Sequence, residues 1–299
     1  MHSRTSQTRA VCAVVVTFHP QPPVLENLRR LTAQAGLVVV VDNGSPPDSM
    51  SVLNQAKLLP NVCLLCNQSN LGIAAALNRG VKHAMASGYD WIATFDQDST
   101  AEENLFEQLW EVYLQVQEHD TVCLLSPVHQ PFGNELGNGM KSAPEFVEIT
   151  TAISSGSLIK SSVFSEVGFY DESLFIDYVD FDFCLRAKRR GFKIIQANGV
   201  RLVHHLGKLE PHRFLGIPLT IKSHRPWRRY YIMRNRILMY RRHGLRLPGW
   251  ALVDFGWLFL DLTKILLFED QKAAKLRNVF KGIIHGLLGR TGALVTPTA

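Results

Sequence analysis

The sequence predicts an α/β fold in which helices cover both faces of a mostly parallel central sheet. Apolar runs of strand length alternate with helical patterns through the first half of the chain, as in residues 10–18, 24–34 and 37–45. The β-branched runs close on polar or glycine-containing turns. Strands that alternate with helices favour parallel pairing, because a crossover helix returns the chain to the same edge of the sheet.

The later segments continue this alternation. Helices are expected at residues 51–59, 70–88, 101–119 and 179–191. Strands are expected at residues 61–67, 90–99, 121–128, 151–160 and 192–205. Ligands of such a sheet bind at the carboxyl ends of its strands, so polar residues at those ends are the first candidates for a site.

Composition places the chain among folded proteins. Of its 299 residues, 46% are hydrophobic and 19% are charged, which is enough to bury a full core. Five dispersed cysteines indicate reduced thiols and a cytoplasmic chain. Cys63 and Cys66 have CxxC spacing, but no second pair completes a zinc site, so we expect a structural strand there. The apolar run at residues 11–17 is too short to span a membrane.

Charge is distributed unevenly along the chain. Residues 1–185 carry 9 Lys and Arg against 21 Asp and Glu, whereas residues 186–299 carry 23 against 5. The two parts therefore have net charges of −12 and +18. A basic C-terminal third indicates an anionic partner such as lipid phosphate or a membrane surface, and the alternative is a solvated basic face. We do not expect nucleic acid as the partner.

The C-terminal segment is apolar but carries charges. Residues 250–268 form a run of helical length that Asp254, Asp261 and Lys264 interrupt. Charges in the centre argue against a spanning helix and favour one that lies in a membrane interface, packs on the main domain or forms a homodimer. We therefore expect a main domain at residues 10–245 and a helical, basic and apolar extension at residues 246–299.

Two aspartates end the strand expected at residues 90–99. Carboxylates at Asp96 and Asp98 can direct oxygen atoms at a divalent cation, and Mg²⁺ or Mn²⁺ keeps positions open for a diphosphate. A cation there would neutralise the charge that develops on a leaving diphosphate. The alternative is a pair of solvated turn residues.

Other polar residues stand at strand ends and helix starts. Asp42 and Asn43 could bind a nucleobase edge, although Asp-Asn-Gly also favours a simple turn. Asn70 and Gly72 open a helix whose N–H groups could face phosphate, and the alternative is a helix cap. Asp180 opens another helix, where it suits either a general base or an N-cap.

The order of these segments resembles the family 2 inverting glycosyltransferases with the GT-A fold. The segments that carry the resemblance are VVVTFHP, VDNGS, NLGIAAALNRG, TFDQDS, ISSGSLI, DYVDFDFCLR and HHLG, over roughly residues 10–245. TFDQDS, FIDYVDFDFCLR and YYIMRN are in addition similar to bacterial rhamnosyltransferases that use dTDP-L-rhamnose. Many family members have Glu-Asp where this chain has Val179-Asp180, so a flanking acid is missing.

The resemblance implies a role for individual residues. Asp180 would be the catalytic base, and Asp98, with Asp96 and His204, would hold the Mg²⁺ or Mn²⁺ ion; whether His204 or His205 is the ligand stays open. The remaining positions are implied in binding the donor nucleotide sugar (Thr17, Asp42, Asn43, Asn70, Gly72, Asn78 and Asp96) or the acceptor (Ser155, Gly156, Arg234 and Asn235).

The implied activity is transfer of L-rhamnose from dTDP-L-rhamnose to a hydroxyl of a glycan or polyprenyl-diphosphate-linked saccharide, for cell-surface polysaccharide. The alternatives are another donor, UDP-GlcNAc or UDP-galactofuranose, and a non-catalytic nucleotide-sugar binding protein. The basic stretch from His212 to Arg246 would meet acceptor diphosphate or anionic head groups through Arg225, Arg228, Arg229, Arg234 and Arg236. Such a protein is expected in the cytoplasm at the inner face of the cell membrane.

Overall fold

A computed structural model describes residues 10–131, 144–204, 209–214 and 217–294; of residues 131, 204, 209–214 and 217–222 it describes the backbone alone. The chain divides into a first unit, Met1–Glu172 with Val179–His205, and a second unit, Ser173–Tyr178 with Leu206–Ala299. The domain boundary predicted after residue 245 lies inside the second unit and stays a prediction. Each unit is described separately below.

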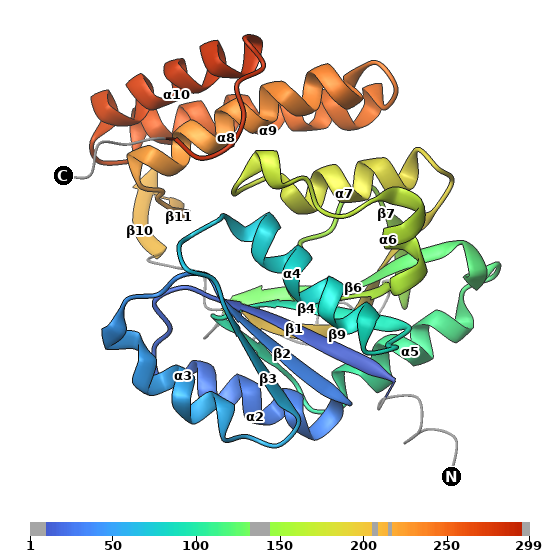
Figure 1. Cartoon of the computed structure of the whole chain (residues 1–299). Coiled ribbons are helices and arrows are strands. Elements are labelled where there is room, and N and C mark those ends of the chain that lie inside the picture. Colours follow the sequence, from blue (N-terminus) through green and yellow to red (C-terminus); the bar gives the residue numbers. More distant parts are fainter. Residues whose placement is uncertain (1–9, 132–143, 205–208, 215–216, 295–299) are drawn as a thin grey trace. The chain divides into compact units, whose positions relative to one another are not determined.

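The first unit is built on one mixed sheet (Figure 1). Among the described residues its strands follow the order β3 (Val62–Cys66), β2 (Leu37–Asp42), β1 (Val11–Thr17), β4 (Trp91–Asp96), β8 (Ser157–Lys160), β6 (Val122–Pro131), β9 (Lys193–His204) and β5 (Ser99–Ala101), with β7 (Phe146–Ile149) paired to β9. Strands β8, β5 and β7 run antiparallel to their neighbours. The other strands share one direction, which confirms the mostly parallel sheet.

Helices cover both faces of this sheet, as predicted (Figure 1). They are α2 (Val24–Gln34), α3 (Met50–Lys57), α4 (Ile73–Ala86), α5 (Leu105–Gln115), α6 (Ser161–Val167) and α7 (Val179–Lys188), with short 3₁₀ turns at Pro47–Ser49, His119–Thr121 and Glu172–Leu174. Side chains of α2, α3 and α5 join one face of β1 and β2 in a single buried cluster. Helix α4 packs on the opposite face.

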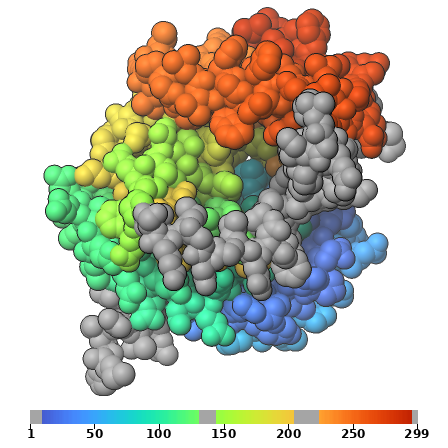
Figure 2. All heavy atoms as spheres, turned by 180° about the vertical axis from the view of Figure 1, so that it is seen from behind, coloured from blue at the N-terminus to red at the C-terminus, as the bar shows by residue number. Residues whose placement is uncertain are grey.

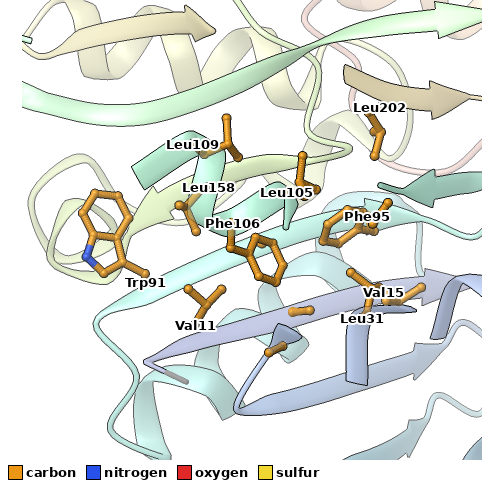
Figure 3. Close-up of a cluster of buried hydrophobic side chains, with 14 of the residues drawn as sticks. Val11, Val15, Leu31, Trp91, Phe95, Leu105, Phe106, Leu109, Leu158 and Leu202 are labelled. Atoms are coloured by element: carbon orange, nitrogen blue, oxygen red, sulfur yellow. The ribbon is translucent and has the colours of Figure 1, made fainter. Parts of the chain in front are cut away.

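Alternation along the strands produces these two buried faces. Val11 and Val15 of β1 point into the cluster with Leu31 of α2 and Phe106 of α5, and all are at most 3% exposed (Figure 3). Because successive strand side chains point to opposite faces, Val14 faces α4 instead. Gly80 permits that contact, since a Cβ atom there would lie 2.2 Å from Val14 Cγ1.

The second unit is mainly helical. It contains an antiparallel hairpin, β10 (Leu209–Phe214) with β11 (Ile217–Lys222), and the helices α8 (Pro226–Met239), α9 (Pro248–Leu267) and α10 (Lys272–Leu287), with a π-helical turn at Tyr240–Gly244. Met233, Ile265 and Val279 form a small core between the three helices. Within the described residues, no helix combines the length and hydrophobicity needed to cross a bilayer.

Buried ion pairs in the second unit correct one expectation. Arg229 and Lys275 both pair with the buried Glu269, and Arg236 Nε lies 2.9 Å from Asp254 Oδ2. Arg229, Arg234 and Arg236 are only 1–4% exposed. The expectation that these three arginines contact acceptor diphosphate or lipid head groups is therefore wrong, because their guanidinium groups are enclosed by protein.

Candidate active site

Parallel pairing brings the predicted strand-end residues together. In the register of β1 with β2, Thr17 lies opposite Asp42, and in the register of β1 with β4, Val16 lies opposite Asp96. Asn43 N donates to Thr17 O at 2.8 Å, so the pairing continues one residue beyond the strand. The three strands therefore end at a common edge of the sheet, where ligands of parallel sheets bind.

The Asp42 carboxylate is the centre of a buried polar cluster at this edge. It is 2% exposed and accepts hydrogen bonds from Thr17 Oγ1 at 3.1 Å, Ser45 N at 2.9 Å and Ser45 Oγ at 2.5 Å. His19 N in turn donates to Ser45 Oγ at 2.8 Å. The cluster joins the loop after β1 to the loop after β2, and two of its members, Thr17 and Asp42, were predicted to bind the donor base.

An amide network shapes the loop that leads into α4. The Asn43 side chain is 3% exposed; its Nδ2 donates to Asn70 Oδ1 at 3.0 Å and Gly72 O at 3.1 Å. Asn70 Oδ1 also accepts from Gly72 N at 2.9 Å, while Asn70 itself is exposed. Gly44 has φ +81°, and a Cβ atom there would lie 2.4 Å from the Ser69 carbonyl carbon. Only glycine fits this close approach.

Asn78, also predicted at the donor, ties α4 to a later segment of the first unit. It is 2% exposed, and its Nδ2 donates to Tyr170 O and to Glu172 Oε1, both at 2.8 Å. Tyr170 N donates back to Asn78 Oδ1 at 2.9 Å. These bonds use both donors of the amide, and donor contact stays a prediction for Asn78.

Ser155 and Gly156, predicted at the acceptor, support the end of β4. Asp96 N donates to Ser155 Oγ at 3.1 Å, and the two hydroxyl oxygens of Ser99 and Ser155 lie 2.7 Å apart. Gly156 N donates to Thr94 O at 2.7 Å. Ser155 is fully buried. Its described contacts hold the backbone of the Asp-x-Asp segment, and acceptor contact stays a prediction for both residues.

Gln97 forms a link that motif reasoning did not reveal. Phe18 N donates to Gln97 Oε1 at 2.8 Å, and Gln97 Nε2 donates to Phe18 O at 3.0 Å. The side-chain amide thus pairs with a backbone peptide unit as a neighbouring strand would. It joins the loop after β1 to the turn between Asp96 and Asp98.

The carboxylates of Asp96 and Asp98 fit a divalent cation. Asp96 is half-buried and Asp98 is exposed, and carboxylate oxygen is the donor that Mg²⁺ and Mn²⁺ prefer. The β5–β9 register sets the backbone of His204 opposite Ser99, one residue after Asp98. The His204 side chain and all of His205 lie outside the described residues. Within the described part of the chain, no three His, Cys, Asp or Glu side chains form a ligand group.

Asp180 stands in the first turn of α7. Its two carboxylate oxygens accept from Phe181 N at 2.9 Å and from Ser154 N at 3.2 Å, which fixes the side-chain orientation. Burial raises the pKa of the neighbouring Cys184 thiol, and the Asp180 charge raises it further, so the thiol stays neutral. Asp182, by contrast, is 2% exposed and pairs with Arg186 at 2.7 Å.

Arg234 and Asn235, predicted at the acceptor, are described within the second unit. They are 1% and 0% exposed, and their side chains bond to backbone carbonyls of residues 174–177 and 292. Acceptor contact is not supported by this burial.

Two aspartates at and just after the end of a central strand of an α/β sheet agree with the resemblance to the glycosyltransferases with the GT-A fold. The chain belongs to glycosyl transferase family 2, whose sequence profile matches residues 12–171, more than half of the chain.

Individual relatives are similar over most of the chain. The dTDP-rhamnosyl transferase RfbF of Shigella flexneri is 29% identical, with 94% of this chain and 97% of that protein covered. Galactofuranosyltransferase GlfT1 of Mycobacterium tuberculosis (strain H37Rv) is 27% identical, with 85% and 90% covered. The mannosyltransferase PcManGT of Pyrobaculum calidifontis, solved with GDP-Man and Mn²⁺, has a TM-score of 0.58 at 13% identity, with 94% and 88% covered. The structural likeness confirms the GT-A fold.

We expect the Asp42→Asn substitution to lower the free energy of unfolding by about 1–3 kcal/mol, because the amide leaves at least one buried donor without its acceptor. Urea unfolding measures the change. Asp48→Asn is the matched control, since Asp48 is exposed in the same loop, and it should alter stability by less than about 0.5 kcal/mol. Equal stability of the two variants would contradict the structural importance of the Asp42 cluster.

Proposed function

We propose that the protein is an inverting, metal-dependent transferase that moves L-rhamnose from dTDP-L-rhamnose to a hydroxyl of a glycan or lipid-linked saccharide in cell-surface polysaccharide synthesis. One observation carries the proposal. Asp96 ends β4 on the strand next to the one that ends in Thr17, Asp98 follows two residues later, and the chain is similar over 94% of its length to a dTDP-rhamnosyl transferase.

The proposed reaction is a single displacement. Asp180 takes the proton from the acceptor hydroxyl, and the hydroxyl oxygen attacks the anomeric carbon from the side opposite the nucleotide. A carbon–oxygen bond to the acceptor forms as the bond to the diphosphate breaks, and dTDP leaves. Configuration inverts, so a β-linked donor yields an α-L-rhamnoside. The two backbone N–H groups bonded to Asp180 hold its carboxylate in one orientation for this step.

Asp96 and Asp98 are proposed to hold the divalent cation, with Asp98 as the main ligand and His204 as a further one. A bound Mg²⁺ or Mn²⁺ ion supplies positive charge that stabilises the leaving diphosphate. The protein contributes the rigid backbone behind these carboxylates, through Ser155 and Gln97. Asp42, with Thr17, and the Asn43–Asn70 loop are proposed to bind the base and nucleotide.

A different donor is the second candidate function. The similarity to galactofuranosyltransferase GlfT1 favours UDP-galactofuranose as the specific alternative, and UDP-GlcNAc is a further one. A non-catalytic nucleotide-sugar binding protein would not need the oriented carboxylate of Asp180.

An exposed apolar surface on α9 and α10 suggests where the acceptor lipid is met (Figure 2 shows one side of these helices in orange and red). Its large side chains are 40–73% exposed: Leu252, Val253, Phe255, Trp257, Phe259, Leu260, Leu266 and Leu267 on α9, and Phe280, Ile284, Leu287 and Leu288 at α10. An apolar surface of this extent marks an interaction site.

The charges of the second unit favour an anionic bilayer as the occupant. In the described residues 223–294, the exposed charged side chains are basic except for Asp270. The basic ones are Arg225, Arg241, Arg246, Lys272, Arg277, Lys281 and Arg290. Apolar side chains beside basic ones are typical of helices that lie in the interface of an anionic membrane. We propose that the protein works at the inner face of the cell membrane through this surface.

Replacing Asp180 with Asn tests the base. We expect dTDP release from dTDP-L-rhamnose in the presence of acceptor to fall about 10²-fold or more, because the amide cannot take the proton. Donor binding, measured by calorimetry, should persist. Glu166→Gln, an exposed carboxylate change on α6, is the control and should retain activity. Near wild-type turnover by Asp180→Asn would overturn the assignment.

A panel of donors and metal ions tests the proposed donor and the proposed divalent cation. We expect turnover with dTDP-L-rhamnose to exceed that with UDP-galactofuranose, UDP-GlcNAc and GDP-mannose, to be lost in EDTA and to return with Mg²⁺ or Mn²⁺. Asp98→Ala should lower turnover by at least about tenfold, with partial recovery at high metal concentration, as loss of one ligand predicts. Preference for a UDP donor would reject dTDP-L-rhamnose as the donor. Full activity in EDTA would reject the dependence on a divalent cation.

Flotation with vesicles tests the membrane surface. We expect the wild-type chain to bind vesicles that contain phosphatidylglycerol, less tightly at high salt. The double change Trp257→Ser with Phe259→Ser should weaken binding by at least about tenfold, because each buried side chain contributes about 1.5–3 kcal/mol. Leu58→Ser with Leu114→Ser, two exposed apolar side chains of the first unit, is the control. Equal flotation of the two double variants would reject the membrane as the occupant of this surface. If the wild-type chain sediments as a dimer and the Trp257→Ser with Phe259→Ser variant does not, the occupant is a second copy of the chain instead.

A further inference from the structure

The segment just before Asp180 has an unusual backbone. Within residues 173–178, Phe175, Asp177 and Tyr178 have φ values of +67°, +64° and +65°. Left-handed conformations cost free energy for residues with a Cβ atom, and they persist only where the surroundings impose them. Glycine would adopt them without this cost, so something in the structure must hold the segment in place.

The side-chain amide of Asn235 on α8 provides that restraint. Its Nδ2 lies 3.0 Å from Leu174 O and 2.8 Å from both Ile176 O and Asp177 O. Asn235 is fully buried, and its Oδ1 accepts from Arg234 Nε at 2.9 Å, which fixes which end of the amide faces the segment. The two hydrogens of this one amide are therefore shared among the carbonyls of Leu174, Ile176 and Asp177.

Side chains of the segment are restrained as well. Arg228 pairs with Asp177 at 2.9 Å, Phe175 stacks on Tyr231 with 5.2 Å between ring centroids, and Tyr178 Oη donates to Asp254 Oδ1 at 2.9 Å. Burial raises the pKa of the Tyr178 phenol, so the hydroxyl stays protonated and continues to donate. All these partners belong to the second unit.

We propose that Asn235 is a positioning residue for sugar transfer, which acts through the 173–178 segment on Asp180. Tyr178 is joined to Asp180 by Val179 alone, so a change in the backbone conformation of Tyr178 reaches the first turn of α7 through a single residue. Release of the three carbonyls lets the segment relax to ordinary φ values and moves the carboxylate from its place. The inference rests on the proposed role of Asp180, and it replaces acceptor contact as the role of Asn235.

The Asn235→Ala variant tests this role. We expect kcat to fall by about 10²-fold, as misplacement of a reacting group by about 1 Å predicts, while the donor KM and the Kd for dTDP stay unchanged. Hydrogen exchange in peptides that cover residues 173–180 should become faster. Tyr178→Phe, which removes the hydroxyl that bonds to Asp254 and Arg236 and keeps the ring, should lower kcat in the same direction and to a smaller extent.

Two controls separate positioning from stability. Val279→Ala opens the small core of the same unit, where Val279 is 6% exposed, and Asn278→Ala removes an amide that bonds only within α10. Both should keep kcat, even where the melting temperature falls as far as in Asn235→Ala. The proposal is overturned if a control variant loses as much kcat as Asn235→Ala at the same loss of melting temperature. It is also overturned if Asn235→Ala and Tyr178→Phe both keep full kcat. An active Asp180→Asn variant would instead overturn the proposed function itself.

Discussion

The parallel hydrogen bonding of β1 between β2 and β4 is the constraint on which the first unit depends. Every side chain of β1 is at most 6% exposed, so its pairing register cannot shift by one residue without turning each side chain to the opposite face. That register sets Thr17 against Asp42 and Val16 against Asp96. In β1 and β2 the polar side chains Thr17 and Asp42 stand at the last position of each strand, and the candidate site follows from this placement.

Most polar groups at these strand ends serve the fold as well as the site. A buried amide or hydroxyl must be hydrogen-bonded, so Asn43, Asn78 and Ser155 bond to other parts of the same unit. Asn70 and Asp98, at the outer side of these networks, are exposed. The buried residues thus give the exposed ones a rigid backbone, which is what the proposed stabilisation of a leaving diphosphate requires.

Sequence periodicity predicted the helices and strands whose formation depends on local residues. It failed for strands and contacts that depend on partners far away in the sequence. Helix α2 has the predicted bounds Val24–Gln34, because its apolar spacing and flanking loops are local signals. The short strands β5 and β7 were not predicted as strands of their own, since their pairing depends on β9. Gln97 bonds to Phe18 across 79 positions, a contact that no spacing encodes. Arginine density likewise indicated a basic surface, but buried acids such as Glu269 and Asp254 neutralise part of it.

The charged residues of helix α9 are explained by the side chains with which they pair, and these partners cannot be identified from the apolar run alone. Asp254 and Asp261 are seven residues apart, about two helical turns, so they lie on one face of α9. Both pair with Arg236 of α8, and Asp254 also accepts from Tyr178. The acids that argue against a spanning helix therefore face the protein, while the other faces keep exposed side chains such as Trp257 and Phe259. The helix proposed to contact the bilayer is thus the same rigid element that restrains the segment before Asp180.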